Sequence, residues 1–267
     1  MPEHIVLEII LYLITGACAG LLAGLLGVGG GLFIVPVLLF ALPLTGIETS
    51  HLMTICVATS LCTIVVTSIS SVLAHHKHQA IIWPVFWMLF PGICIGAVLG
   101  AFVADAISQQ LLKNLFAVAV ILIALKMLFH IKPQGQTNLP GKIALAGTGS
   151  AIGCLSAMIG IGGGSMTVPV LNYWQTPMAK AVATSAACGL PIAVAGTLGF
   201  IIAGMDLTDT IPYSSGYVYW PAVLGIISSS VLFAPIGAKM AHKIPAALLS
   251  RLFAIFLLLV GSKVLLS

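Results

Sequence analysis

Charged residues are scarce in this chain of 267 residues: only 6% are charged, against roughly 25% in soluble globular domains. Apolar residues make up 60%. A chain with so few polar groups could not cover its own surface in water, so the composition predicts a polytopic membrane protein. The net charge of +4 is too small to indicate nucleic-acid binding. No room is left for a catalytic domain outside the bilayer, and we predict that the protein is not an enzyme.

Metal and redox motifs are also missing from the sequence. The six cysteines lie inside apolar stretches and form no C-x-x-C pair, which excludes a redox motif or an external disulfide framework. The segment His75-His76-Lys77-His78 has the residue types of a metal site, but no Cys or carboxylate accompanies it. We interpret it as a solvated loop. No metal and no other cofactor is predicted.

The chain contains an internal repeat. Residues 20–38 align without gaps on residues 153–171, and both copies contain three consecutive glycines. Further along, Ala58-Thr59-Ser60 recurs as Ala183-Thr184-Ser185, and Trp83-Pro84 recurs as Trp220-Pro221. We predict one integral membrane domain built by duplication, with a first repeat at residues 1–131, a linker at 132–141 and a second repeat at 142–267.

Each repeat contains four apolar stretches. Six of the eight have about the 17 to 25 residues that one tilted transmembrane helix needs. The first stretch of each repeat is longer and is interrupted by the glycines, each of which weakens a helix by about 1 kcal/mol relative to Ala. Broken helices are therefore expected at residues 27–31 and 160–164.

The basic residues distinguish two arrangements of the broken stretches. If each stretch crosses the bilayer once, the ten Lys and Arg divide equally between the two sides and specify no orientation. If each stretch dips in and returns as a hairpin, eight of the ten share one side, which is the bias typical of membrane proteins. We predict an all-α fold with two inverted-topology repeats, each a glycine-broken helical hairpin followed by three transmembrane helices. Both termini are then outside the cytoplasm.

The glycine-rich breaks are candidates for a binding site. A helix that begins after three glycines presents free backbone N–H groups and the positive end of its dipole, and glycine lets a ligand approach closely. In transporters with inverted repeats, such helix starts meet near the bilayer midplane. Tight helix packing is the alternative role. The candidate residues are Gly29, Gly30 and Gly31 in the first copy and Gly162, Gly163 and Gly164 in the second.

Two hydroxyl pairs are candidates for the lining of the same site. If Ser50 and Thr176 are the N-caps of the following helices, each pair lies about 12 to 15 Å into the bilayer, level with the glycines. Hydrogen bonding between helices is the alternative role for these hydroxyls. The candidates are Thr59 and Ser60, Thr184 and Ser185, and in addition Ser165 at the second break.

These motifs resemble those of the sulfite exporter TauE/SafE family. The resemblance rests on Gly27-Val28-Gly29-Gly30-Gly31 with Val35-Pro36, on Ala58-Thr59-Ser60 and on their second copies, and it covers nearly the whole chain. It implies transport of small sulfur-containing anions, such as sulfite or organosulfonates, out across the inner (plasma) membrane.

We therefore expect a secondary transporter that exports such anions by alternating access around a midplane site formed by the two breaks. A channel or uniporter for a small neutral solute, in which the half-helices form a selectivity barrier, is the alternative. The expected partners are the small anionic substrate and membrane lipid, without nucleic acid. Whether the chain forms a homo-oligomer is left open.

Overall fold

The computed structural model describes residues 2–26, 30–47, 49–129, 141–207, 211–241 and 246–266. Within these residues the chain forms ten α-helices, a short 3-10 helix and a two-stranded hairpin. Eight of the helices in the described part are long and apolar enough to cross a bilayer. The predicted all-α polytopic membrane protein is confirmed.

The order of the helices is the same in the two halves of the chain. The first half contains α1 (Pro2–Leu26), α2 (Gly31–Leu44), α3 (Leu52–Lys77), α4 (Trp83–Ala106) and α5 (Gln109–Phe129). The second contains α6 (Lys142–Ile159), α7 (Gly164–Tyr173), α8 (Met178–Ala203), α9 (Trp220–Ala241) and α10 (Ala246–Leu266). A 3-10 helix (Met205–Leu207) and the strands β1 (Ser214–Ser215) and β2 (Val218–Tyr219) connect α8 to α9.

Both predicted helix breaks are present. The first separates α1 from α2, and the second separates α6 from α7. Gly160 ends α6 with a φ of 72°, a left-handed conformation that glycine adopts without strain. Residues 27–29, and with them Gly29, lie outside the described residues, as does most of the predicted linker at 132–141. The domain boundaries stay predictions.

The predicted N-caps were wrong. His51 precedes α3 and Pro177 precedes α8, and neither makes a side-chain capping hydrogen bond. At the start of α3 the side-chain carbonyl of Gln109 accepts hydrogen bonds from the N–H groups of Met53 (3.1 Å) and Thr54 (3.3 Å). The side chain of Gln109 in α5 thus caps the start of α3, for which the sequence predicts Ser50 as the cap.

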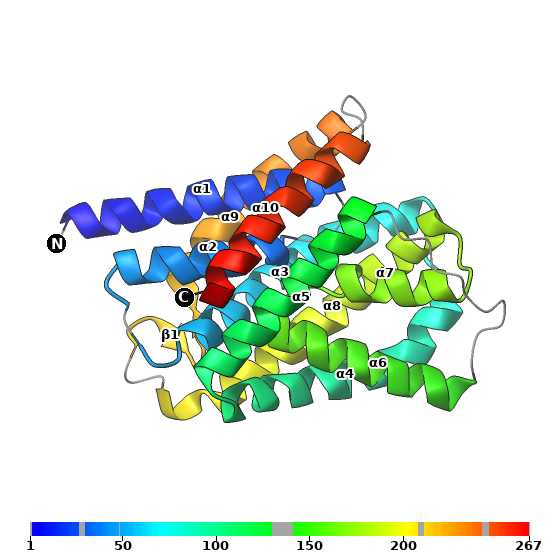
Figure 1. Cartoon of the computed structure of the whole chain (residues 1–267), viewed down its shortest axis with the longest axis horizontal. Helices are drawn as coiled ribbons and strands as arrows, with labels where there is room; N and C mark the ends of the chain where they lie inside the picture. Colours follow the sequence, from blue (N-terminus) through cyan, green and yellow to red (C-terminus); the bar gives the residue numbers. More distant parts are fainter. Residues whose placement is uncertain are drawn as a thin grey trace.

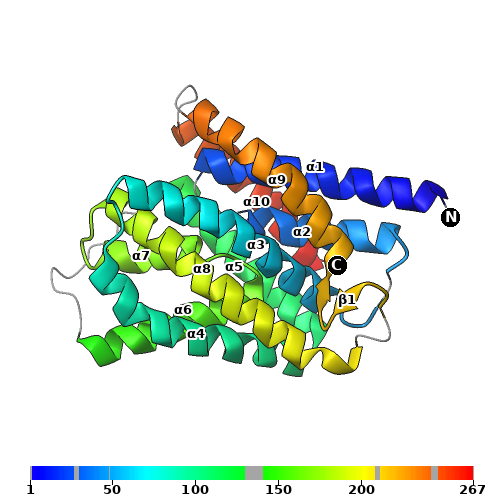
Figure 2. The same cartoon turned by 180° about the vertical axis from the view of Figure 1, so that it is seen from behind.

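The breaks turn the chain back on itself. In Figure 1, α1 begins and α10 ends at the same end of the molecule, and α2 returns towards that end. The helix α6 begins at the opposite end, and α7 lies there too (Figures 1 and 2). The inverted topology and the orientation of both ends in a membrane stay predictions.

The two halves interlock instead of forming separate cores. The helix α1 packs along α9, α6 packs along α4, and the pairs α3 with α8 and α5 with α10 lie between the halves. The first two pairs approach at backbone distance: a Cβ added to Gly16 would lie 2.2 Å from the carbonyl oxygen of Ile226, and one added to Gly92 would lie 1.9 Å from that of Ala146. Every one of these helix pairs joins one half to the other.

Candidate functional site

The two glycine breaks meet inside the molecule. Gly31 faces the backbone of Gly160, because a Cβ added to Gly31 would lie 2.4 Å from the carbonyl oxygen of Gly160. Gly160 itself lies against α3, where an added Cβ would be 3.1 Å from the Cα of Val57. The structure therefore places the start of α2 against the end of α6, where the second break begins. Of the predicted glycines that it describes, Gly30, Gly31, Gly162 and Gly163 are buried and Gly164 is half-buried.

Ser60 and Ser185 bind the backbone of the second break. The Ser60 hydroxyl donates to the carbonyl of Gly160 at 3.0 Å, and the Ser185 hydroxyl donates to the carbonyl of Gly163 at 3.3 Å. Both serines are completely buried. These contacts place both side chains level with the break, as expected. A contact of either serine with a substrate stays a prediction.

Thr59 and Thr184 make equivalent contacts with the starts of two other helices. The N–H of Tyr219 donates to the Thr59 hydroxyl oxygen at 3.1 Å, and the N–H of Ile82 donates to that of Thr184 at 3.0 Å. These N–H groups immediately precede α9 and α4, so each threonine caps a helix of the other half. These two hydrogen bonds of Thr59 and Thr184 correspond to the alternative role in the sequence analysis, hydrogen bonding between helices. A contact of either threonine with a substrate stays a prediction.

Three hydroxyls beside the second break are buried without a hydrogen-bond partner among the described residues. They belong to Ser156 in the last turn of α6 and to Ser165 and Thr167 near the start of α7. A buried polar group without a partner costs about 1–3 kcal/mol, which makes such a cluster a place for a ligand or water. Ser165 was predicted, whereas Ser156 and Thr167 were not. Their only signal in the sequence is a hydroxyl in an apolar stretch close to the glycines.

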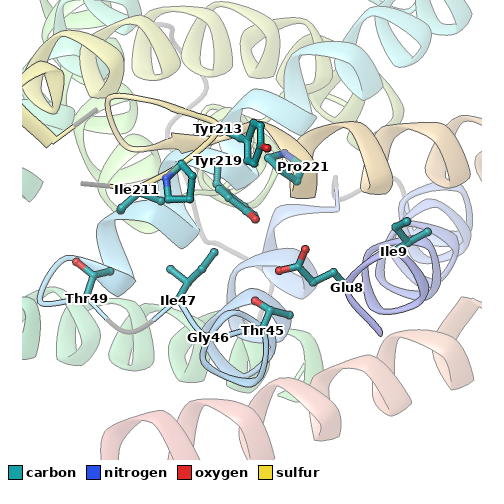
Figure 3. A pocket seen from close by; sticks show the side chains of 11 residues that line it. Glu8, Ile9, Thr45, Gly46, Ile47, Thr49, Ile211, Tyr213, Tyr219 and Pro221 are labelled. Carbon is teal, nitrogen blue, oxygen red and sulfur yellow. The ribbon is translucent and has the colours of Figure 1, made fainter. Parts of the chain in front are cut away.

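A cavity of about 800 Å³ lies at the end of the molecule where α1 begins. Its walls come from the start of α1, the segment after α2 and the segment before α9. Figure 3 shows the Glu8 carboxylate and the Tyr219 hydroxyl pointing toward one another across this space. The described lining contains the carboxylate of Glu8 and no basic side chain. Burial and the charge of Glu8 raise the pKa of Tyr219 to about 12, so its phenol is neutral at physiological pH.

A second polar group at this end links three elements. The Tyr217 hydroxyl, next to β2, donates to the carboxylate of Asp105 at the end of α4 and lies 3.4 Å from Nδ1 of His51. Burial and the hydrogen bond to Asp105 raise the pKa of Tyr217 above its ordinary range. The starts of α3 and α9 are thereby tied to the end of α4. Sequence reasoning gave these residues no role.

Potential metal ligands do not converge in the described part of the chain. No group of three or more His, Cys, Asp or Glu lies close enough together to hold a metal ion there. His76, Lys77 and His78 are exposed at the end of α3, in the position expected for a solvated turn. The prediction that the protein has no cofactor stays a prediction.

Comparison with known proteins identifies the family. The family model described as "Sulfite exporter TauE/SafE" matches residues 12–264. The chain belongs to the TauE/SafE family. A TauE/SafE chain with eight apolar helices of spanning length is a multi-pass membrane transporter.

Similar proteins from distant organisms carry matching names. A "Probable membrane transporter protein" of Haemophilus influenzae is 37% identical to the TauE/SafE chain over 255 residues, with 95% of this chain and 96% of the relative covered. One of Methanocaldococcus jannaschii is 30% identical, with 88% and 86% covered, and one of Bacillus subtilis is 26% identical, with 96% of each covered. No solved structure gives a significant match.

Proposed function

We propose that this TauE/SafE protein exports small sulfur-containing anions such as sulfite or organosulfonates, and that the anion binds where the glycine breaks meet. The family description supports the substrate class. The observation that carries the site is the meeting of the two breaks: Gly31, where α2 begins, lies against Gly160, and the Ile64 side chain packs on both Gly31 and Gly162, two residues before α7. Helix starts bind anions through free N–H groups and the positive end of the dipole.

The burial of the breaks supports alternating access. The described glycines of both breaks, and Ser60 and Ser185 beside them, are buried or half-buried, so a substrate enters only if helices move apart. The main helix pairs all join one half to the other. We propose that relative movement of the halves opens the site to one side of the inner (plasma) membrane at a time.

The direction of transport follows from charge. When the cell interior is negative, the expulsion of one unit of negative charge is favoured by about 2.3 kcal/mol per 100 mV. In the proposed orientation, the cavity beside Glu8 opens to the outside. A wall with a carboxylate and no described basic side chain favours the release of an anion over its capture.

Transport by purified protein in liposomes tests this function. Efflux of sodium [35S]sulfite or of labelled sulfoacetate is expected to be saturable and to increase when the trans side is made positive. Gly163→Leu should abolish efflux, because the added side chain would occupy the break. The matched control is Gly147→Leu on α6, where an added Cβ meets nothing within 4 Å. Flux that is unsaturable, independent of potential and selective for neutral solutes would instead establish the channel.

The orientation has its own test. In a background without the native cysteines, Thr45→Cys and Asp206→Cys should both react with a membrane-impermeant maleimide added outside intact cells. The two positions belong to different halves, so one experiment reports on both. Reaction of either position only from the cytoplasmic side would contradict the inverted topology with both termini outside.

A further inference from the structure

The two glycine breaks differ in the side chains around them. In the aligned repeats, each unpartnered hydroxyl of the second break corresponds to an apolar residue of the first. The corresponding pairs are Ser156 with Ala23, Ser165 with Leu32, and Thr167 with Ile34. The first break therefore lacks the hydrogen-bond donors that the second break has.

The helices that pack on the breaks differ at one decisive position. When Ala58-Thr59-Ser60 is placed on Ala183-Thr184-Ser185, Ile64 of α3 corresponds to Gly189 of α8. The Ile64 side chain fills the space at the first break, because its Cδ1 is 2.8 Å from the position of a Cβ on Gly31. The same Ile64 side chain also packs on Gly162 of the second break, 2.9 Å from an added Cβ. At Gly189 an added Cβ would be in ordinary contact with its nearest neighbour at 3.6 Å, so α8 has room for one methyl group where α3 has the Ile64 side chain.

Polar groups lie around Gly189. The atoms nearest to a Cβ added at Gly189 are the hydroxyl oxygen of Ser68 at 3.6 Å and the backbone nitrogen of Gly163 at 3.7 Å. The hydroxyl oxygen of Thr167 lies 3.3 Å from a Cβ added at Gly163, which is the residue that precedes α7. Thr167 is completely buried, and its hydroxyl has no hydrogen-bond partner. A helix start and an unpaired buried hydroxyl thus coincide beside the small residue Gly189.

We propose that the oxyanion group of the substrate binds at the second break alone, beside the unpaired hydroxyl of Thr167 at the start of α7, when movement of the halves separates α7 from Gly189. The hydroxyls of Thr167 and Ser165 and the N–H groups of Gly163 and Ser165 donate to its oxygens, since the N–H groups of Gly164 and Met166 already donate to backbone carbonyls. Ser68 of α3 donates from the opposite side. The first break forms an apolar wall that closes the site. This inference rests on the proposed function and assigns its specificity to one half of the protein.

A pair of equivalent, shape-conserving substitutions tests the asymmetry. Thr167→Val removes the hydroxyl at the second break, and Ile34→Val makes a similarly small change at the matching position of the first. With sodium [35S]sulfite in proteoliposomes, Thr167→Val should raise KM roughly 10- to 100-fold, the loss expected when one hydrogen bond to a charged group is removed. Ile34→Val should leave KM within about twofold of the unmodified protein, because a methylene contact is worth little to a distant anion.

A second variant and a binding measurement distinguish a loss of substrate binding from misfolding of the protein. Gly189→Ala adds one methyl group in ordinary contact with Ser68 and the backbone of Gly163, without a steric clash, and it should also raise KM, whereas Gly147→Ala should not. Sulfite should increase the thermal unfolding temperature of the unmodified protein and of Ile34→Val, but not that of Thr167→Val, since a bound ligand stabilises the folded state.

The outcomes separate this inference from the function on which it rests. If the unmodified protein moves neither sulfite nor a sulfonate, the proposed function fails. If it moves them and Thr167→Val keeps the unmodified KM, only the assignment to the second break fails. Equal increases of KM in Thr167→Val and Ile34→Val would show that both breaks hold the anion and would overturn the asymmetry.

Discussion

The two interrupted hairpins share a backbone plan but differ in their chemistry. In the first, α2 starts with the buried apolar residues Leu32 and Ile34 and lies against Ile64, whose side chain also reaches Gly162 of the second break. In the second, α7 starts among unpaired hydroxyls and faces Gly189. Duplication supplied two helix starts at one place. Divergence of a few side chains then made one of them apolar and the other polar.

The hydrogen bonds around the two breaks show where the equivalence of the two halves ends. Thr59 and Thr184 make matching hydrogen bonds, each to the start of a helix in the other half. Ser60 and Ser185 do not match, because Ser60 binds Gly160 of the opposite half and Ser185 binds Gly163 of its own half. The threonines therefore belong to the duplicated scaffold, and the serines lie where the two halves diverge.

The largest expected effect comes from giving the second break the side chain of the first. Gly189→Ile places in α8 the residue that α3 has at the equivalent position, and this side chain would extend past the one methyl group for which there is room, against Ser68 and the backbone of Gly163. Sulfite efflux should fall to the level of empty liposomes. Gly147→Ile is the control, because that glycine is exposed on α6. Normal efflux by correctly inserted Gly189→Ile protein would refute the difference between the breaks.

A second comparison concerns stability. Gly31→Ala would push a methyl group against the carbonyl of Gly160, and such overpacking of backbone costs up to about 3 kcal/mol. Gly163→Ala should cost less, since its nearest neighbour is the flexible end of Ile192, 2.7 Å from an added Cβ. Thermal unfolding in detergent would measure both. The prediction is wrong if Gly163→Ala lowers the unfolding temperature as much as Gly31→Ala.

The threonine pair should respond equally in the two halves. Thr59→Val and Thr184→Val keep the side-chain shape, but each leaves the N–H that precedes α9 or α4 without its partner. Each should lower stability by about 1–2 kcal/mol, the cost of an unsatisfied buried N–H. The KM for sulfite should not change in either variant. An increase of KM in one variant alone would show that this threonine contributes to substrate binding.

Sequence reasoning found the breaks and the hydroxyl pairs because their signals are local. Glycine runs interrupt a helix wherever they occur, and the repeat shows them twice. It failed for the cap of α3, since Gln109 reaches that helix start from α5, 55 residues away in the chain. It also missed Thr167 and Ser156: a hydroxyl in an apolar helix usually bonds to its own backbone, and only tertiary packing shows that these two do not.

The difference between Ile64 and Gly189 is another feature whose meaning depends on tertiary packing and not on the local sequence. The aligned repeats contain both residues, but the alignment does not say which element each one faces. Only the packed structure places Ile64 against both Gly31 and Gly162 and shows that Gly189 has room for one methyl group beside Gly163. Interlocking of the halves was likewise not predictable, because every long helix of this chain is apolar on most of its surface and has no distinct face to pair.

The smallest expected effect lies at the cavity beside Glu8, which both breaks would share as an exit in the proposed orientation. Glu8→Gln removes the carboxylate from its wall and should slow sulfite release by at most about twofold, because a single half-exposed charge is strongly screened. The difference in sulfite release between Glu8→Gln and the unmodified protein should shrink as the salt concentration rises from 0.05 M to 0.5 M, because the Debye length falls from roughly 14 to 4 Å.

Since the pKa of Tyr219 is about 12, the phenol opposite Glu8 adds no charge of its own below about pH 10. A change of more than tenfold, unaffected by salt, would mean that Glu8 contacts the anion or a co-transported cation directly, and it would place part of the specificity outside both glycine breaks.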